Sequence, residues 1–185
     1  GGELIVEARQ NLTADGTKVE SGATAEASSS GGALFSGTGA IAVANNKPIL
    51  KASVTDSSGI KFKTVSINAL SYNKSYAKTF GINIGGIAGV GASVSRATSD
   101  GSAEAWLDST IRIKTVENLR ILAQANDNAY AESKSGAGGI ISGSGSSAKS
   151  YAEMTVKAEI RGNRTVNVVN DINISAIAAP KSTAL

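Results

Sequence analysis

The sequence has 185 residues, the length of one ordinary domain or of a piece of something longer. It contains no cysteine and no histidine, which excludes disulfide scaffolds, thiolate metal sites and a Ser-His-Asp catalytic triad. The net charge of +3 and the aromatic content of 4% are too low to predict nucleic-acid binding. We therefore expect no enzymatic activity, no cofactor, no metal site and no nucleic-acid partner.

The chain begins with GGELIVEARQ, which has no initiator methionine, no basic segment and no apolar signal segment. We expect a mature or excised piece, with any export signal lying upstream. These first residues also resemble the end of an earlier repeat, so we expect the chain to be cut from a longer array.

Repeats are the strongest pattern along the chain. Three versions of a phrase rich in alanine, serine and glycine begin at Ala23, Ser75 and Ala129. A second phrase follows each version, beginning in turn at Asp56, Asp108 and Arg161. The period of about fifty residues is typical of repeat units that stack on their neighbours.

This pattern predicts one segment over 1–179. Its repeats run roughly over 23–74, 75–128 and 129–179, and we expect a tail or linker at 180–185.

Apolar and polar residues alternate within each repeat, which is the signal of a β-strand. Ile60 and Phe62 alternate with lysines, and Met154 to Ile160 shows the same period of two. No segment has a capped helical stripe, so the prediction is all β. Turn residues punctuate the strands at Asp15-Gly16, Asp56 to Gly59, Asp100-Gly101 and Gly162-Asn163.

A parallel β-helix, or a closely related β-solenoid, fits strands arranged in long repeats. Two or three coils per repeat would fit the number of short strands that the turns imply. Alternating alanines, such as Ala23, Ala25 and Ala27 or Ala129 and Ala131, predict a narrow interior between closely spaced walls. The alternative fold is an antiparallel β-sandwich.

The uncharged stretch GINIGGIAGVGASVS, residues 81–95, permits three interpretations. It is too short and too polar for a membrane span, so we expect no membrane insertion. The related stretch 143–150 nearly matches a phosphate-binding loop, but Ala148 replaces its second glycine and no helix is expected to follow. Glycine that permits close backbone approach or forms the corner of a coil is the interpretation that we favour.

Candidate binding residues come from two surface patterns. Lys63, Lys114 and Arg164 each precede Thr-Val, and stacked repeats would align these cations in a row. Such a row suits an anionic glycan, although exposed charge also protects a sheet from self-pairing. Tyr76 and Tyr130 occupy matching positions beside inward-facing alanines, so both are expected to point outward.

Exposed aromatic rings can hold sugars, and Trp106 is a further candidate for that group. Ordinary cross-strand packing on the outer face is the alternative role of these rings.

The stretch GGIAGVGASVSRATSDGSAEAWLDSTIRIKTVENLRILAQAN, followed by AYAESKSGAGGIISGSGS, resembles repeats of very large bacterial exoproteins. These are the filamentous-haemagglutinin-type adhesins, particularly the leukotoxin-family filamentous adhesins of Gram-negative anaerobes. The resemblance covers about Glu3 to Ala179 and is one of pattern and composition. It implies a right-handed β-helical filament that is exported by two-partner secretion to the cell surface or the medium.

Three functions follow, in order of preference. The first is a structural stalk or filament segment of a secreted or surface adhesin, with neighbouring repeats as its partners. The second is an adhesive module that binds host-cell glycans or receptors through an extended face. The third is a β-helical polysaccharide-active enzyme, for which the sequence clusters no carboxylates. Open ends would also favour end-to-end self-association.

Overall fold

The computed structural model describes residues 2–55, 62–109 and 116–185. These residues form seven strands and no helix, which confirms the all-β prediction. The strands are β1 (Gly2–Gln10), β2 (Ala23–Asn46), β3 (Ile49–Val54), β4 (Phe62–Asp108), β5 (Val116–Gly138), β6 (Ile141–Arg161) and β7 (Val168–Ala184).

The strands of the sheet pair in parallel. β4 pairs with β1, β2, β3, β5 and β6, and β5 also pairs with β7. Outside the named strands, the described residues include one isolated antiparallel bridge, between Leu12 and Lys18. The antiparallel sandwich is therefore wrong. The sheet is open, because its strand order ends at β1 and at β7.

Residues that pair across neighbouring strands lie a whole repeat apart in the sequence. Asn73 bonds to Asp127, 54 residues further on, and Lys47 bonds to Asp100, 53 residues further on. The repeat origins also coincide with the register, since Ala23 pairs with Ser75 and Ser75 pairs with Ala129. The stacked unit is therefore the whole repeat of about fifty residues.

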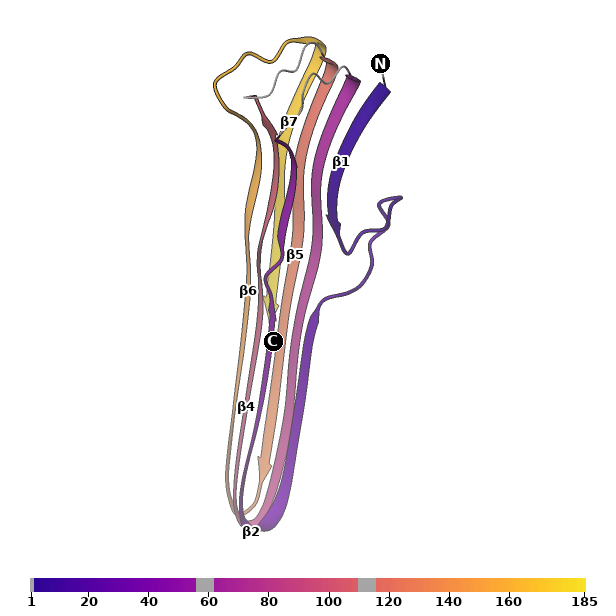
Figure 1. Cartoon of the computed structure of the whole chain (residues 1–185). Coiled ribbons are helices and arrows are strands. Elements are labelled where there is room, and N and C mark those ends of the chain that lie inside the picture. Colours follow the sequence, from indigo (N-terminus) through magenta and orange to yellow (C-terminus); the bar gives the residue numbers. More distant parts are fainter. Residues whose placement is uncertain (1, 56–61, 110–115) are drawn as a thin grey trace.

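Each repeat runs out along one arm and back along a second (Figure 1). We call these the outgoing arm and the return arm. The bend between them falls near Gly85 in β4 and between β5 and β6 in the next repeat. One repeat thus makes a single long pass, and the expectation of two or three coils per repeat is wrong.

The Asp100-Gly101 pair is one reason why the sequence predicted too many coils per repeat. Its turn chemistry predicts a break, but both residues continue through β4. A Cβ at Gly101 would lie 2.7 Å from the carbonyl oxygen of Pro48, in the gap between β2 and β3. The glycine permits a close approach there instead of reversing the chain.

The last residues also differ from expectation. β7 extends to Ala184, and residues 180–184 pair with β5 from Asp127 to Ala131. The stretch 180–185 is therefore mostly strand and not a tail.

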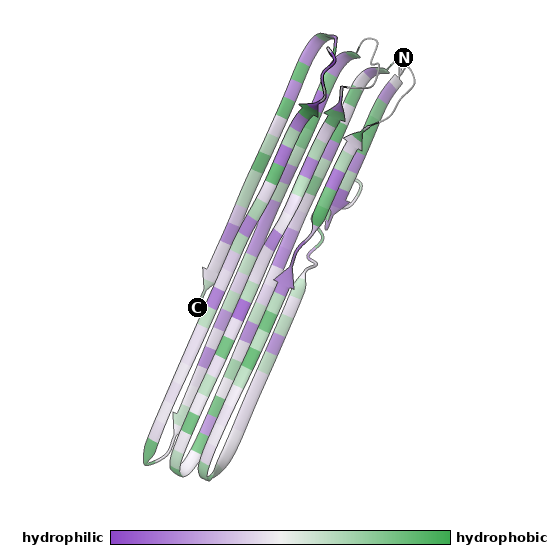
Figure 2. Cartoon of the chain, turned by 60° about the vertical axis from the view of Figure 1, so that its left-hand side comes forward, coloured by the Kyte–Doolittle hydropathy of each residue, from purple (hydrophilic) through white to green (hydrophobic). Residues whose placement is uncertain are grey.

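The interior between the two arms changes character along their length. Far from the bend it holds large apolar side chains that include Val65, Ile67, Leu107, Leu119 and Ile121. Further along, a buried cluster consists of alanines alone, with Ala23, Ala25 and Ala27 packed against it. Ala129 and Ala131 belong to that cluster and are fully buried, which confirms the narrow interior. Hydrophobic and hydrophilic residues alternate along the arms in Figure 2.

Near the bend the interior is polar. The Thr79 hydroxyl lies 2.9 Å from the Ser133 hydroxyl, which donates to the carbonyl oxygen of Ser93 on the return arm at 2.9 Å. The Asn83 amide donates to the carbonyl oxygen of Val90 at 2.7 Å. Because buried polar groups are costly without partners, these bonds across the interior replace apolar packing where the arms are closest.

The glycine-rich stretch 81–95 lies within β4 and contains the bend. A Cβ at Gly85 would overlap the backbone of Ala88, and one at Gly91 would lie 2.8 Å from the carbonyl oxygen of Gly136. The described residues contain no helix long and apolar enough to cross a membrane. Residues 143–150 lie inside β6, without the strand-to-helix turn of a phosphate loop. Close backbone approach is thus confirmed for Gly85 and Gly91, whereas no atom lies within 4 Å of the Cβ positions of Gly143 and Gly145.

Two matched glycine substitutions test the width of the interior. We expect Gly91→Ala to lower the free energy of unfolding by about 1–3 kcal/mol, because the new methyl group would press on backbone. Gly143→Ala is the control, since no atom lies within 4 Å of its Cβ position. Chemical denaturation of both variants gives the comparison. Equal effects would show that the arms are not closely spaced at Gly91.

Small-angle X-ray scattering tests the long arms. The 23 residues of β5 extend over roughly 75 Å at about 3.3 Å per residue. A body with that long dimension has a radius of gyration of about 23 Å, against about 16 Å for a compact domain of this length. A value near the compact one, measured on monodisperse protein, would contradict the single-pass architecture.

Candidate functional site

The outer face of the outgoing arms carries a pair of aromatic side chains that could contact a ligand. Tyr76 on β4 pairs with Tyr130 on β5, and their rings stack with centroids 5.2 Å apart and planes 5° from parallel. The neighbouring Ala77 and Ala131 are fully buried, so both tyrosines point outward as predicted. The stack is a partly exposed aromatic surface two repeats wide.

Charges beside the stack are paired. Glu132 forms ion pairs with Lys134 and, at 3.9 Å, with Lys78. The hydrogen bond from Lys134 is the main cause that lowers the pKa of Glu132. Partial burial, with the nearby Glu132 carboxylate, raises the pKa of the Tyr130 hydroxyl. The tyrosines therefore lie beside a cluster of paired charges of both signs and not on a bare basic stripe.

The expected row of cations does not follow the strand register. Val65 pairs with Leu119 and Val116 pairs with Val168, so the three Thr-Val phrases are out of step. Lys63 instead lies 3.6 Å from the carboxylate of Glu117.

The other two candidates of that row fall elsewhere. Arg164 is exposed in the connection after β6, where its backbone N–H donates to the Ser109 hydroxyl at 3.3 Å. Lys114 lies outside the described residues. A role for these cations in binding stays a prediction.

Trp106 does not join the tyrosines. It lies on the return arm of β4, where it pairs with Ser53 and Glu159. The guanidinium of Arg161 lies 4.2 Å from the centroid of its ring, a cation–π contact that uses this aromatic surface.

The first repeat contains an insertion that breaks the regular pattern. Gln10 pairs with Ser71 and Ala23 pairs with Ser75, so residues 11–22 occupy the interval that 72–74 fill in the next repeat. The chain leaves the sheet there and forms a loop beside it (Figure 1). The sequence shows this signal as extra length before the first alanine phrase, but the repeat comparison alone does not reveal where the loop lies.

Hydrogen bonds hold this loop against β4. The side-chain amide of Asn11, whose φ is 53°, donates to the carbonyl oxygens of Ser21 at 3.0 Å and Tyr72 at 2.8 Å. Asp15 accepts hydrogen bonds from Thr13 and Thr17, and the bond from Thr13 is the main cause that lowers the pKa of its carboxyl. Gly16 has a φ of 85°, which confirms the predicted Asp15-Gly16 turn.

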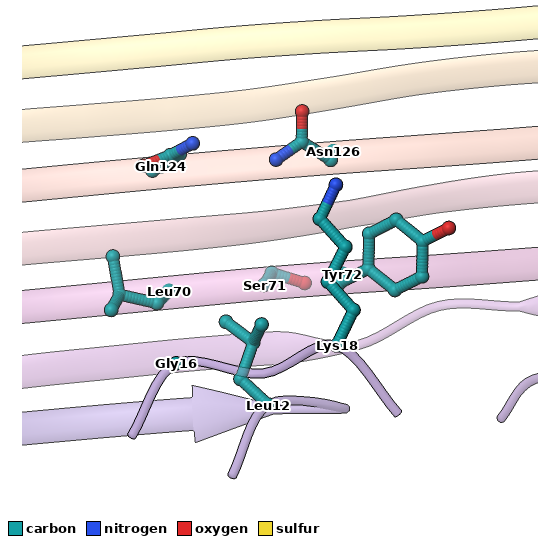
Figure 3. A pocket seen from close by; sticks show the side chains of 8 residues that line it. All are labelled: Leu12, Gly16, Lys18, Leu70, Ser71, Tyr72, Gln124 and Asn126. Atoms are coloured by element: carbon teal, nitrogen blue, oxygen red, sulfur yellow. The ribbon is translucent and has the colours of Figure 1, made fainter. Parts of the chain in front are cut away.

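A groove lies between this loop and the outer face of the sheet (Figure 3). We call it the Lys18 groove. Its first part has a volume of about 170 Å³ and is lined by Leu12, Gly16, Lys18, Leu70, Ser71, Tyr72, Gln124 and Asn126. A second part of about 190 Å³ shares Lys18, Tyr72 and Asn126 and continues to Lys181 on β7. The Lys18 ammonium lies 4.8 Å from the centroid of the Tyr72 ring.

One carboxyl lies inside the protein. Asp127 is 1% exposed and accepts a hydrogen bond of 2.8 Å from Asn73, its partner on β4. Burial is the main cause that raises the pKa of Asp127, and Asp100 adds to it, while the hydrogen bond from Asn73 opposes it. Among the described residues, no cationic side chain forms an ion pair with Asp127, and no three acidic residues gather where they could hold a metal.

Comparison with known proteins identifies no relative. No family model matches the chain, and neither the curated proteins nor the solved structures contain a match. The function must therefore be argued from the geometry.

The buried carboxyl gives a pH-dependent prediction. Because folding raises the pKa of Asp127, its burial costs least at low pH, where the carboxyl is protonated in both states. Stability falls as the pH rises from the unfolded-state pKa to the folded-state pKa, and the loss persists above it. We expect Asp127→Asn to raise the free energy of unfolding at pH 7 by about 1–3 kcal/mol, with a much smaller gain at pH 4.

Asp171→Asn is the matched control, because Asp171 is exposed on β7. Its effect should stay within about 0.5 kcal/mol at both pH values. Denaturant titrations at the two pH values provide the measurement. If Asp127→Asn destabilises the protein at pH 7, and more there than at pH 4, the ionised carboxylate makes stabilising contacts and the argument from burial fails.

Proposed function

We propose that this chain is a structural segment of a stalk or filament built as a right-handed parallel β-helix. The observation that carries the proposal is the parallel register, in which each residue pairs with its counterpart one whole repeat away. Stacking of this kind transmits the same pairing from one repeat to the next and needs no special contact at any one position.

The geometry favours a stiff stack with a large surface, and not a large length gained per repeat. Neighbouring strands in a sheet lie about 4.8 Å apart, so each repeat adds only that distance along the stack. The same repeat contributes two arms of roughly 75 Å, hydrogen-bonded along most of their length. A stack of such repeats is broad and resists bending in the plane of its sheets.

Neighbouring repeats are the partners that this proposal requires. Ile172 and Ile174 on β7 are in register with the buried Leu119 and Ile121, yet they are 55% and 42% exposed. Another repeat, or another copy in an end-to-end contact, would bury these side chains as the internal repeats bury theirs.

We extend the proposal to a secreted or surface-displayed bacterial exoprotein of the filamentous-haemagglutinin type, exported by two-partner secretion. The resemblance of the repeat phrases and the absence of cysteine support this extension. In this role the segment is not an enzyme.

A second candidate function is adhesion through the outer face. The Tyr76–Tyr130 stack favours it, because two parallel rings with exposed area can contact the apolar face of a sugar. Lys63 and Arg164, both exposed, would add sites for anionic groups. Under this function, host-cell glycans or receptors are the partners.

Force spectroscopy tests the structural role. Pulled from its two ends, a stack of repeats should unravel in steps, and each repeat of about 53 residues should release roughly 180 Å of chain. Smooth extension without discrete steps would mean that the repeats hold no load, and the stalk proposal would be wrong.

Cell binding distinguishes adhesion from a purely structural role of the stack. Labelled protein is added to host cells at several salt concentrations, together with a Tyr76→Ser/Tyr130→Ser variant whose folding is verified by its thermal transition. Adhesion through the stack predicts saturable binding that the double variant loses by about tenfold or more. Equal binding of the two proteins, or none by either, would remove the stack as an adhesive site.

A further inference from the structure

The inserted loop 11–22 gives the first repeat a surface that the later described repeats do not share. In repeat proteins, an insertion in one unit maps to a loop on one face, and that face is often the binding face. The loop is ordered by the bonds of Asn11 and Asp15, so the Lys18 groove that it forms is a defined shape.

The groove offers side chains and not backbone to a ligand. β5 is paired on both sides at Asn126, with β4 and with β7. In this region β4 lacks a strand partner on its other side only at residues 72–74, and loop 11–22 occupies that short gap, where the Asn11 amide donates to the carbonyl oxygen of Tyr72. A peptide that binds by strand addition requires a free edge, which this position lacks. The side-chain donors and acceptors include the amides of Gln124 and Asn126, which lie on the same side of β5 in Figure 3, and Asn128 lines the second part of the groove.

Two lysines, Lys18 and Lys181, give the groove positive charge, and the one carboxyl among its lining residues, Asp127, is 1% exposed. The Lys18 side chain passes the Tyr72 ring and extends toward Asn126 (Figure 3). In the described part of the chain, neither Lys18 nor Lys181 forms an ion pair, whereas Lys74 beside them pairs with Glu20 at 3.0 Å. The contact with Tyr72 favours this position of the Lys18 ammonium before any ligand arrives, which reduces the entropy cost of binding.

The dimensions suit a short chain lying across the strands. Each part of the groove is smaller than the ~300 Å³ of a pocket that encloses a whole metabolite. Together the parts extend from the loop over β4 and β5 to β7, about three strand spacings or roughly 15 Å. Leu12 and Leu70 supply an apolar wall at the end nearest the loop.

We propose that the Lys18 groove binds a short acidic oligosaccharide. Lys18 and Asn126 receive a carboxylate or sulfate, Gln124 bonds to ring hydroxyls, and the C–H face of a sugar packs on Leu12 and Leu70. Lys181 receives a second acidic group further along the chain. This site goes beyond the structural role, and its failure would leave the stalk proposal standing because the force measurement does not depend on it.

The test is a calorimetric or NMR titration of the 185-residue chain with trigalacturonic acid and with its methyl ester. The ester keeps the rings and removes the charge. We expect the acid to bind with a dissociation constant of about 1 mM or tighter, and the ester to bind at least about tenfold more weakly. Lys18→Gln should weaken binding of the acid about tenfold, and Asn126→Ala about threefold to tenfold.

Lys149→Gln is the control, because it removes the same charge from an exposed position on β6, far from the groove in the fold. It should change the affinity less than about twofold. Thermal transitions of the variants verify folding, and NMR shifts should concentrate at Lys18, Tyr72 and Asn126.

Three outcomes would overturn the proposal. They are no binding of the acid, equal losses for Lys18→Gln and Lys149→Gln, and equal affinity for a triglutamate peptide. The second would show that the loss of affinity depends only on the net charge of the protein. The third would show that the groove accepts acidic peptides as well as acidic sugars.

Discussion

The distance between the two arms is the constraint on which the rest of the structure depends. Far from the bend it admits leucine and isoleucine. Further along it admits alanine and small polar residues such as Ser71, Asn73 and Ser75, and near the bend serine, threonine and asparagine beside glycine. Small side chains bury little apolar area, so hydrophobic burial per residue must fall toward the bend. Hydrogen bonds across the interior, such as that from Asn83 to Val90, take over as the contacts that fix the arms there.

Parallel register is the second constraint, because it stacks every side chain on its counterpart in the next repeat. This stacking brings two tyrosines into favourable contact, and it leaves a buried carboxyl without a cationic partner. Tyr76 and Tyr130 gain a stacking contact, whereas Asp127 finds the amide of Asn73 above it but no cation in the described interior. The contact at each position of the stack therefore depends on which two residues the neighbouring repeats place there, whether that contact is favourable or costly.

This also explains which features the sequence could predict. Alternation has a period of two and shows directly which residues face inward, so the alanine interior and the outward tyrosines follow from local pattern. Arm length does not follow, because an alternating run looks the same whether the strand is short or long. Asp100-Gly101 has the chemistry of a turn, and only the nearby Pro48 backbone shows why glycine stands there within a strand.

The row of cations failed for a related reason. A matching phrase shows that segments are similar, but the pairing register depends on the number of residues between phrases. Small differences in spacing place Lys63 beside Glu117 and shift the later phrases out of step. The Lys18 groove was missed because it joins a loop to two strands more than fifty positions apart. No local motif contains that combination.

These constraints bear on where such a protein can acquire specificity. A uniform stack presents the same chemistry at each level, which suits mechanical continuity but distinguishes poorly among ligands. Residues inserted into one repeat do not have to pair with the neighbouring repeat. Loop 11–22 is such an insertion, and it does not interrupt the stack, since pairing resumes at Ala23 with Ser75. The loop then contributes Leu12 and Lys18 to a surface whose other side chains come from the ladder itself. Stiffness and recognition can therefore coexist here. The stacked strands form the rigid base of the groove, and the inserted loop 11–22 forms its side.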